Sequence, residues 1–494
     1  MEVINMALIN WDKYIGYEAE QLPPAIRPIL FLHGTHYEMG VQYGKTVSGM
    51  IKRNFCLVAG DVLARFSREE VEEKVQMFEA HMAEITPEIK DLWKGIGDGA
   101  GLDYWDIAMI NFQLRLSYPG LMCSTVGAFG SATKEGEPII GVNADVTFNM
   151  SGYGVTLIIE PDKGHLCIVN AQLAGQTGSN FAMNEKGLVI TLTGGEHVRK
   201  EDTQFGYADQ CSLVTYLAMS CDNADDAQKR FSEMELAGGW IFLFADETGR
   251  MMITEHTSAM ERIRFPGDHG EKDYLLAANH FLDEEMRVSS KLVGNEDSYY
   301  RFETEKKLIE GADEPLTVKD LMDILGSRDY WDGTAWHFDA WGEETCMNTP
   351  EMRAPDFRIG QRCFALPKEK TAYIMQCGED RFNAFVPEAT GQYSKIALGE
   401  NMLKTVALLE ENACHDVWEA GHTLSDGKNT KGSLISLLDQ AKASIWRGKN
   451  HQANARILQT NDMVATRDSA EKAANEFQNA YVKAQIIIKI AKEG

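Results

Sequence analysis

Four short polar turns constrain the fold of this chain more than any other feature of its sequence. Each turn contains a glycine and separates two runs of apolar or β-branched residues; the turns occupy residues 134–137, 161–164, 184–187 and 246–249. Such turns are typical of β-hairpins, which force neighbouring strands to be antiparallel. Helical patterns interrupt the hairpins at 207–235 and 299–310. We therefore predict an α+β sandwich, with sheet against sheet and helices outside.

The chain divides into three parts on the same patterns. Residues 1–122 contain an apolar strand, Ile29–Leu32, and a helical pattern from Ser67 to about Gly97. Residues 123–396 hold the hairpins, and residues 397–494 are helical throughout. Because no long linker precedes this last part, we expect it to pack against the rest as a helical extension.

Composition excludes several classes of function. The formal net charge of −26 argues against nucleic acid or an anionic membrane as a partner, since both require clustered Lys and Arg. No run approaches the roughly 18 apolar residues of a membrane span, and the N-terminus lacks a signal-peptide pattern. The nine cysteines include no CxxC pair, which favours a reducing cytoplasm. No metal-binding or phosphate-binding motif is present, so we predict no metal and no cofactor.

Cys123 stands at the start of the first hairpin and is the candidate nucleophile. Its strand turns at 134–137 and returns through Pro138–Asp145, which brings a carboxylate near the thiol. If the chain is cut before Cys123, the new α-amine lies beside the sulfur of the same residue. A thiol has a pKa near 8.5 and an α-amine near 8, so this amine is basic enough to take the thiol proton at neutral pH.

Five motifs in the same order resemble the peptidase C45 family, which contains acyl-coenzyme A:6-aminopenicillanic acid acyltransferase, within the cysteine N-terminal nucleophile (Ntn) hydrolases. They are Gly-x-x-Tyr-Glu-x-Gly-x-Gln-x-Gly at 34–44, Cys-Ser-Thr at 123–125, Asn-x-Asp at 143–145, Asn-Glu-Lys-Gly-Leu at 184–188 and Ala-Asn-His at 278–280. The Asn-Glu-Lys-Gly turn is similar to one in the choloylglycine hydrolases. The resemblance spans roughly residues 29–380.

The resemblance implies a four-layer αββα sandwich and self-cleavage between Met122 and Cys123. Residues 1–122 would then remain in the fold as a small subunit, with 123–396 as the core. Carried over by position, Cys123 resembles the nucleophile and Asp145 the carboxylate that holds its amine or thiol. Asn279 resembles the oxyanion donor, and Arg301 an active-site arginine.

One departure affects the expected substrate. The bile-salt branch has a second asparagine where this chain reads Thr191-Leu-Thr-Gly-Gly195, so bile-salt hydrolysis is not expected. Backbone N–H groups near Thr193 or Gly194 are the expected substitutes. His280 is grouped with Thr193 and Gly194 as a candidate for substrate or oxyanion binding; it could tune the site, but a structural hydrogen bond is the first expectation.

The sequence thus predicts a cytoplasmic, cofactor-independent amidohydrolase or acyltransferase that acts on linear C–N amide bonds through a Cys123 thioester. The expected partner is a small N-acyl amide, with acyl-CoA as an alternative acyl donor; a homo-oligomer of the two-subunit product is left open. An ester or phospholipid deacylase on the same scaffold is the second possibility, and a catalytically inactive binding scaffold is the third.

Overall fold

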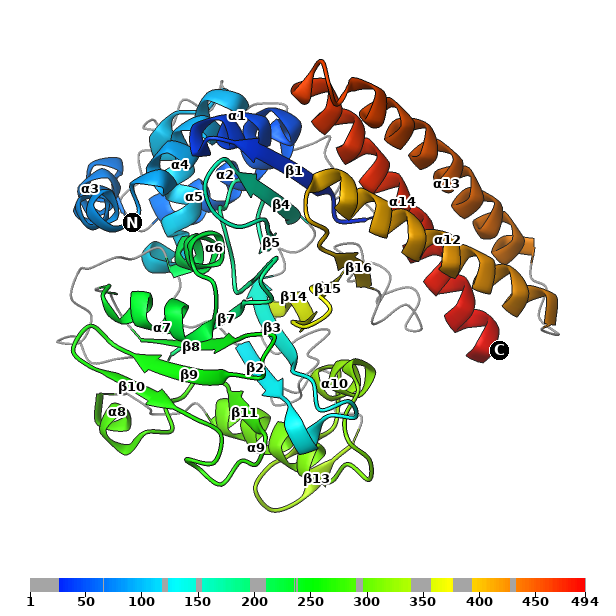
Figure 1. Cartoon of the computed structure of the whole chain (residues 1–494). Coiled ribbons are helices and arrows are strands. Elements are labelled where there is room, and N and C mark those ends of the chain that lie inside the picture. The colour runs from blue at the N-terminus through cyan, green and yellow to red at the C-terminus, as the bar shows by residue number, and fades with distance from the viewer. Residues whose placement is uncertain are drawn as a thin grey trace.

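The computed structural model of the chain describes residues 26–64, 66–117, 123–147, 153–195, 210–234, 236, 239–289, 296–338, 357–375, 393–426 and 432–493 (Figure 1). Two large sheets form its centre. The eight-stranded sheet has the order β1 (Ile29–Gly34), β4 (Val155–Pro161), β5 (Cys167–Ala171), β6 (Phe181–Asn184), β7 (Val189–Gly194), β8 (Trp240–Ala245), β9 (Met251–His256) and β10 (Glu261–Arg264). The six-stranded sheet has the order β11 (Tyr274–Ala277), β2 (Cys123–Ala128), β3 (Ile139–Thr147), β14 (Phe357–Leu366), β15 (Thr371–Met375) and β16 (Tyr393–Ala397). A small ribbon pairs β12 (Tyr330–Trp331) with β13 (Trp336–His337).

The four predicted hairpins are all present. The turns at 134–137, 161–164, 184–187 and 246–249 join β2 to β3, β4 to β5, β6 to β7 and β8 to β9, each pair antiparallel. The strand β1 is different, because it pairs in parallel with β4 from more than a hundred residues away. A parallel pair requires a long crossover connection, which local turn patterns do not reveal.

Helices cover the outer face of each sheet, which confirms the αββα sandwich. One core lies between the eight-stranded sheet and the first seven helices, and another lies between the six-stranded sheet and α9 and α10. These helices are α1 (His36–Thr46), α2 (Ser48–Leu63), α3 (Arg68–Ile85), α4 (Pro87–Ala100), α5 (Tyr104–Ser117), α6 (Gln210–Ser220), α7 (Ala224–Ser232), α9 (Glu296–Glu310) and α10 (Val318–Leu325). The short α8 (Glu284–Ser289) lies between β11 and α9 in the chain. A third core fills the space between the inner faces of the sheets.

Two glycines of the 34–44 motif, Gly40 and Gly44, serve close helix packing. A Cβ atom on Gly40 would come within 2.3 Å of the Leu92 carbonyl oxygen, and one on Gly44 within 2.3 Å of the Ile96 carbonyl oxygen. Gly95 of α4 approaches the backbone of α1 equally closely. The two helices therefore cross with their backbones in contact, which no larger residue at these positions permits.

Two of the predicted helical stretches are divided in the structure. The pattern from Ser67 to Gly97 forms α3 and α4, because Pro87 begins a new helix at its first position. Proline cannot donate within a helix but is well accommodated in its first turn. The pattern at 207–235 likewise forms α6 and α7, separated at Cys221–Asn223.

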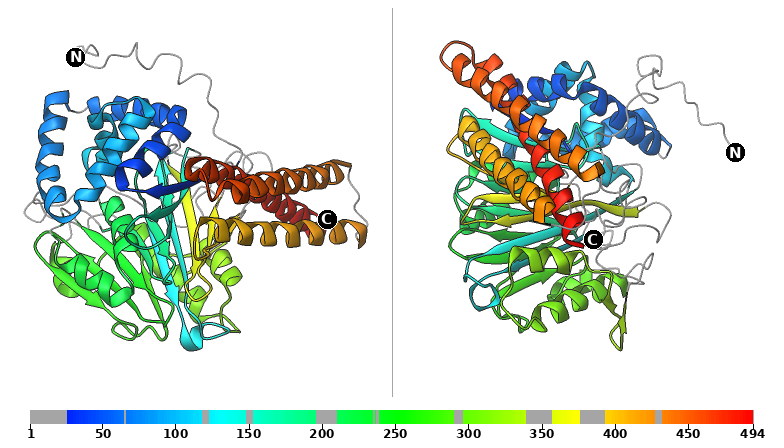
Figure 2. Two further views of the ribbon diagram at one scale, coloured as in Figure 1. Left: turned by 45° about the horizontal axis from the view of Figure 1, so that its top comes forward. Right: turned by 90° about the vertical axis from the view of Figure 1, so that its right-hand side faces the viewer.

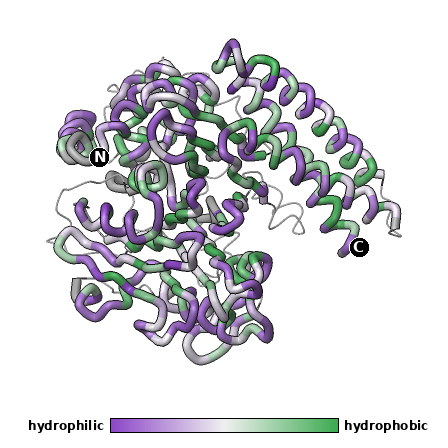
Figure 3. Tube along the Cα trace, in the orientation of Figure 1, coloured by the Kyte–Doolittle hydropathy of each residue, from purple (hydrophilic) through white to green (hydrophobic). Residues whose placement is uncertain are grey.

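The C-terminal helices α12 (Met402–Asp426), α13 (Gly432–Leu458) and α14 (Met463–Glu493) form a bundle that projects from one side of the sandwich (Figure 2). Hydrophobic and hydrophilic residues alternate along them, as expected of helices that each bury one face (Figure 3). Their apolar residues join the core between the two sheets. The bundle packs where β1 and β16 form the edges of the two sheets.

Side chains of α14 satisfy the free edge of β1. The Asn475 amide accepts from the Ile29 N–H group (2.9 Å) and donates to the Ile29 carbonyl oxygen (2.7 Å). Glu471 accepts from the Phe31 N–H group (2.9 Å), and Arg467 donates to the Phe31 carbonyl oxygen (3.1 Å). An uncovered edge strand would expose unpaired backbone groups. The helix therefore completes the hydrogen bonding of the sheet with side chains in place of another strand.

Replacing Asn475 by alanine removes both hydrogen bonds to Ile29. We expect Asn475→Ala to lower the free energy of unfolding by about 1–3 kcal/mol, because partly buried backbone groups lose their partners. Asn479→Ala, the same change on the same helix, is the control and should cost clearly less. Urea denaturation of both variants measures the difference. Equal midpoints would show that the edge contacts contribute nothing to stability.

Candidate active site

Cys123 is the first residue of β2, which lies between β3 and β11 in the six-stranded sheet. Its backbone pairs with Ala144 of β3, and Thr125 pairs with Ala277 at the end of β11. The residues that follow β11 are therefore brought to the start of β2. Only 2% of the Cys123 surface is exposed.

Strand alternation places the side chains of β2 on two faces. The Thr125 hydroxyl lies 2.7 Å from the Thr191 hydroxyl of β7, so Thr125 faces the other sheet. Cys123 is two residues earlier and shares this inner face, because side chains repeat every second residue in a strand. Ser124 faces the opposite way, toward α9, where its hydroxyl meets Arg301.

The side-chain amide of Asn279 holds the backbone N–H group of Cys123. Its Oδ1 atom accepts from Cys123 N (2.8 Å) and from Arg301 Nη2 (2.8 Å), and its Nδ2 atom donates to the Gly194 carbonyl oxygen (2.7 Å). Two donors at one atom and one acceptor at the other determine the orientation of the amide. Among the described residues, the second Nδ2 hydrogen has no acceptor.

Arg301 holds the other side of the Cys123 backbone. It lies on α9, is only 3% exposed, and donates from Nη1 to the Cys123 carbonyl oxygen and to the Ser124 hydroxyl (2.9 Å). The guanidinium also donates to Asn279 Oδ1, so it connects a carbonyl oxygen, a hydroxyl and a side-chain amide around the start of β2. Such a planar fork of donors suits the binding of several oxygens at once.

The structure brings three of the four expected catalytic residues together: Cys123, Asn279 and Arg301. The backbone of Asp145 is adjacent to Ala144, the partner of Cys123, but the Asp145 side chain lies outside the described residues, as does Met122. The roles that the resemblance implies for Asp145 and Met122 therefore stay predictions.

Thr193 and Gly194 also lie at this site, where they contact the segment that carries Asn279. The Thr193 hydroxyl donates to the Ala278 carbonyl oxygen (3.0 Å), and Gly194 presents its carbonyl oxygen to Asn279. Both contacts join the end of β7 to the segment after β11. These two contacts help to position Asn279, and the expected role of the backbone N–H groups of Thr193 and Gly194 stays a prediction.

His280 makes the structural hydrogen bond that was expected. Its Nδ1 atom lies 2.7 Å from the Ser298 hydroxyl, and its ring stacks on Tyr299 with centroids 4.0 Å apart. Ser298 also accepts from the backbone N–H group of Asn279 (2.8 Å). Burial, together with the charge of Arg301, lowers the pKa of His280 to about 3, so the ring is neutral at neutral pH.

A buried ion pair supports the segment that carries Asn279. Glu255 of β9 pairs with Arg264 (2.8 Å) and accepts from the backbone N–H groups of Leu282 and Asp283. Arg264 in turn donates to the Leu276 carbonyl oxygen (3.0 Å). Because both charges are buried and paired, this network holds the chain on both sides of Asn279.

Sequence reasoning missed Ser124, Ser298 and Glu305. The helical spacing of Ser298, Arg301 and Glu305 puts all three on one face of α9. Once Arg301 is a candidate, that spacing is the signal that could have found the others. Glu305 is fully buried, and burial raises the pKa of its carboxyl well above the usual range; the charge of Arg301 and the Ser124 hydroxyl lower it by less.

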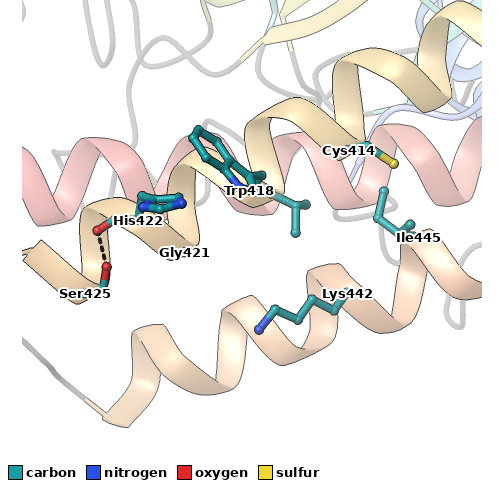
Figure 4. Close-up of a pocket in the computed structure, with 8 residues that line it drawn as sticks. Cys414, Trp418, Gly421, His422, Ser425, Lys442 and Ile445 are labelled. Atoms are coloured by element: carbon teal, nitrogen blue, oxygen red, sulfur yellow. Dashed lines mark hydrogen bonds between the residues drawn. The ribbon is translucent and has the colours of Figure 1, made fainter.

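A cavity of about 450 Å³ lies far along the C-terminal bundle and contains none of these residues. It is a groove between α12 and α13, lined by Trp418, Val417 and Ile445, and Lys442 of α13 also lines it (Figure 4). Within the described residues, the one group of three potential metal ligands, His415, Asp416 and Glu419, is also on α12. None of the described helices combines the length and the apolar content that a membrane span requires.

A family model described as acyl-coenzyme A:6-aminopenicillanic acid acyl-transferase matches residues 131–347. The chain resembles this family. The resemblance expected from the motifs is thus confirmed over that stretch, which includes Asn279 and Arg301 and begins after Cys123. The match supports an acyltransferase or amide hydrolase of the Ntn type. No protein of curated function matches the sequence.

Solved structures of two kinds of hydrolase are similar over part of the chain. A mutant of conjugated bile acid hydrolase from Clostridium perfringens is 11% identical, with a TM-score of 0.34, over 56% of this chain and 93% of that one. Penicillin V acylase from Agrobacterium tumefaciens is 10% identical, with a TM-score of 0.35, over 56% of this chain and 87% of that one.

The neutral state of His280 predicts a pH dependence of stability. The unfolded chain binds a proton at His280 below the ordinary pKa of 6.5, whereas the folded chain does so only near 3. Stability should therefore fall as pH drops from about 6.5 toward 3, with a slope of at most about 1.4 kcal/mol per pH unit from this group. Comparing urea unfolding of wild type and His280→Gln isolates the contribution. Parallel curves would contradict a neutral His280.

Proposed function

We propose that this chain is a cysteine Ntn amidohydrolase or acyltransferase that cleaves itself between Met122 and Cys123. The observation that carries the proposal is a pair of hydrogen bonds to the Cys123 backbone. Asn279 accepts from its N–H group, and Arg301 donates to its carbonyl oxygen. Any buried backbone group needs a partner, but here both partners are side chains, at the two positions that resemble the oxyanion donor and the active-site arginine. The same two contacts hold the residue in place when the peptide bond before it is gone.

Self-cleavage would begin with attack of the Cys123 sulfur on the carbonyl carbon of Met122. The thiol proton passes to the nitrogen of Cys123 as the C–N bond breaks, which leaves a thioester and a free α-amine. Water then hydrolyses the thioester. Before cleavage this nitrogen is an amide and cannot act as a base, so the uncut chain would be inactive toward other substrates.

In the mature enzyme the α-amine of Cys123 would take the thiol proton, and the thiolate would attack the carbonyl carbon of an N-acyl amide. Asp145 would orient the amine or thiol. The unused hydrogen of Asn279 Nδ2 would donate to the oxyanion, a role worth on the order of 3 kcal/mol per donor. The leaving amine departs, and water or a second amine then releases the acyl group from the thioester.

The two fragments would stay together, because the first part of the chain is built into the fold. The strand β1 pairs along its whole length with β4, and α1–α5 share a core with the eight-stranded sheet. Residues 1–122 are therefore proposed to be a small subunit, with the core at 123–396 and the helical extension at 397–494. Release of this small subunit would expose much of the first core to water.

Self-cleavage predicts two bands of roughly 14 and 41 kDa on a denaturing gel, at ~110 Da per residue. Cys123→Ala should remain one band, because it lacks the attacking sulfur. The control Cys414→Ala removes the same atom from α12 and should be cut normally. Mass spectrometry of the larger fragment should find Cys123 at its N-terminus. An uncut wild-type chain with full amidase activity would refute the α-amine mechanism.

Replacing Asn279 by aspartate keeps an oxygen that can accept from Cys123 but removes the amide donors. We expect Asn279→Asp to lower kcat for an N-acyl amide by about 100- to 1,000-fold, the usual effect of losing one oxyanion donor. Thermal unfolding of the variant checks that it folds. A kcat close to that of wild type would exclude the oxyanion role.

A deacylase of esters or phospholipids is the alternative reaction on the same site, since a Cys123 thioester can form from an ester as well as from an amide. A panel of N-acyl amides and acyl esters that share an acyl group distinguishes the two. Turnover of the esters alone would replace the amide proposal. Turnover of neither, with an uncut chain, would leave a binding scaffold.

A further inference from the structure

Glu305 is a buried carboxyl group next to the candidate site. Its surface is 0% exposed, and neither of its side-chain oxygens meets full hydrogen-bonding geometry with a described residue, although the Ser124 hydroxyl is near enough to favour the ionised form to a small extent. An isolated ionised carboxylate in such surroundings costs far more free energy than the neutral acid. A buried acid in this situation therefore keeps its proton.

The position of Glu305 connects it to Cys123 through two neighbours. It follows Arg301 by four residues on α9, the spacing at which side chains of opposite charge pair on a helix. Ser124 is the residue after Cys123. Its hydroxyl lowers the pKa of Glu305 by less than burial raises it, and the same hydroxyl accepts a hydrogen bond from Arg301. Yet Arg301 donates to Cys123 and Asn279, and neither oxygen of Glu305 is bonded to it.

We propose that Glu305 is a positioning residue that stays protonated while the site works, so that Arg301 remains directed at Cys123 and Asn279. Ionised Glu305 would compete for the guanidinium from one helical turn away. Arg301 would then release the Cys123 carbonyl oxygen and the Asn279 amide, and the reaction would stop. This role rests on the proposed function, and nothing in it requires Glu305 to touch the substrate.

Few other charges act on Glu305. Of the elements that pack against α9, β2 contributes the Ser124 hydroxyl, and β11 contributes Tyr274, whose hydroxyl is bonded to Glu310. The strand β12 contributes Tyr330, which stacks on His337. The charges of α10 are exposed: Lys319 and Asp323 pair with each other, and Asp320 binds Thr317. Within the described part of the chain, Arg301 is the charged group that affects the Glu305 pKa.

The protonation of Glu305 can be tested without any enzyme assay. Infrared difference spectra of wild type and Glu305→Gln at neutral pH should show the carbonyl band of one protonated carboxyl group in wild type only. Glu303→Gln, the same change two residues away on another face of α9, should leave this band in place. Absence of the band from wild type at neutral pH would overturn the proposal.

The positioning role requires a pH profile. Above the pKa of Glu305, kcat of wild type for an N-acyl amide should fall about tenfold per pH unit, because each unit lowers the protonated fraction tenfold. Glu305→Gln carries a neutral side chain of the same shape and should lose this alkaline decline, whereas Glu303→Gln should keep it. The same decline in wild type and Glu305→Gln would overturn the role even if the infrared band is found.

Failure of the proposed function would be recognised separately, as an uncut chain that turns over no substrate. The pH comparison is then made on the rate at which iodoacetamide alkylates Cys123, followed by mass spectrometry of the Cys123 peptide. Arg301 contacts the backbone of Cys123, so its displacement should change the environment of the thiol. A difference in pH dependence between wild type and Glu305→Gln supports the proposal, and identical profiles overturn it.

Discussion

The hydrogen bonds to the two backbone groups of Cys123 are the interaction on which the site depends. Asn279 takes the N–H group and Arg301 the carbonyl oxygen, and the two side chains are bonded to each other. Cys123 is the first residue of its strand, where the ladder of the sheet no longer satisfies every backbone group. Side chains from the segment after β11 and from α9 satisfy these groups instead, and the sulfur stays on the inner face of the sandwich.

The remaining polar groups of the site keep these two side chains in place. Asn279 is bonded through Gly194 to the end of β7 and through Ser298 to α9. The Glu255–Arg264 pair then holds the chain on either side of it. A buried polar network of this kind stabilises one arrangement. Any other arrangement leaves a buried group without a partner, and its desolvation then destabilises the fold. Glu305 is an exception on both of its oxygens, and its burial favours the neutral acid.

The C-terminal bundle covers the free edge of the larger sheet. The strand β1 lies at the edge of the larger sheet, and α14 satisfies its free backbone groups with Asn475, Glu471 and Arg467. Burial raises the pKa of Glu471 to about 7, even though it accepts from Phe31. If the chain is cut as proposed, this contact joins the end of the large subunit to the small one. The bundle would then contribute to holding the two fragments together.

Local patterns in the sequence determined the hairpins and the placement of Cys123 at the start of a strand. Turn residues and strand alternation depend on neighbours in the chain, so they are visible without a structure. Asn279 and Arg301 came from the family resemblance, and the structure adds which of their atoms meet Cys123. The division at Pro87 was also within reach of local rules, although the periodic pattern obscured it.

Only the tertiary structure decided the parallel pairing of β1 with β4, the cover that α14 gives to β1 and the burial of Glu305. Each joins segments far apart in the chain, and a sequence does not state which distant groups will meet. Glu305 shows the reason most clearly. In the sequence it is one acidic residue among 74. Its unusual state arises from the removal of water around it by packing, and that is a property of the folded molecule alone.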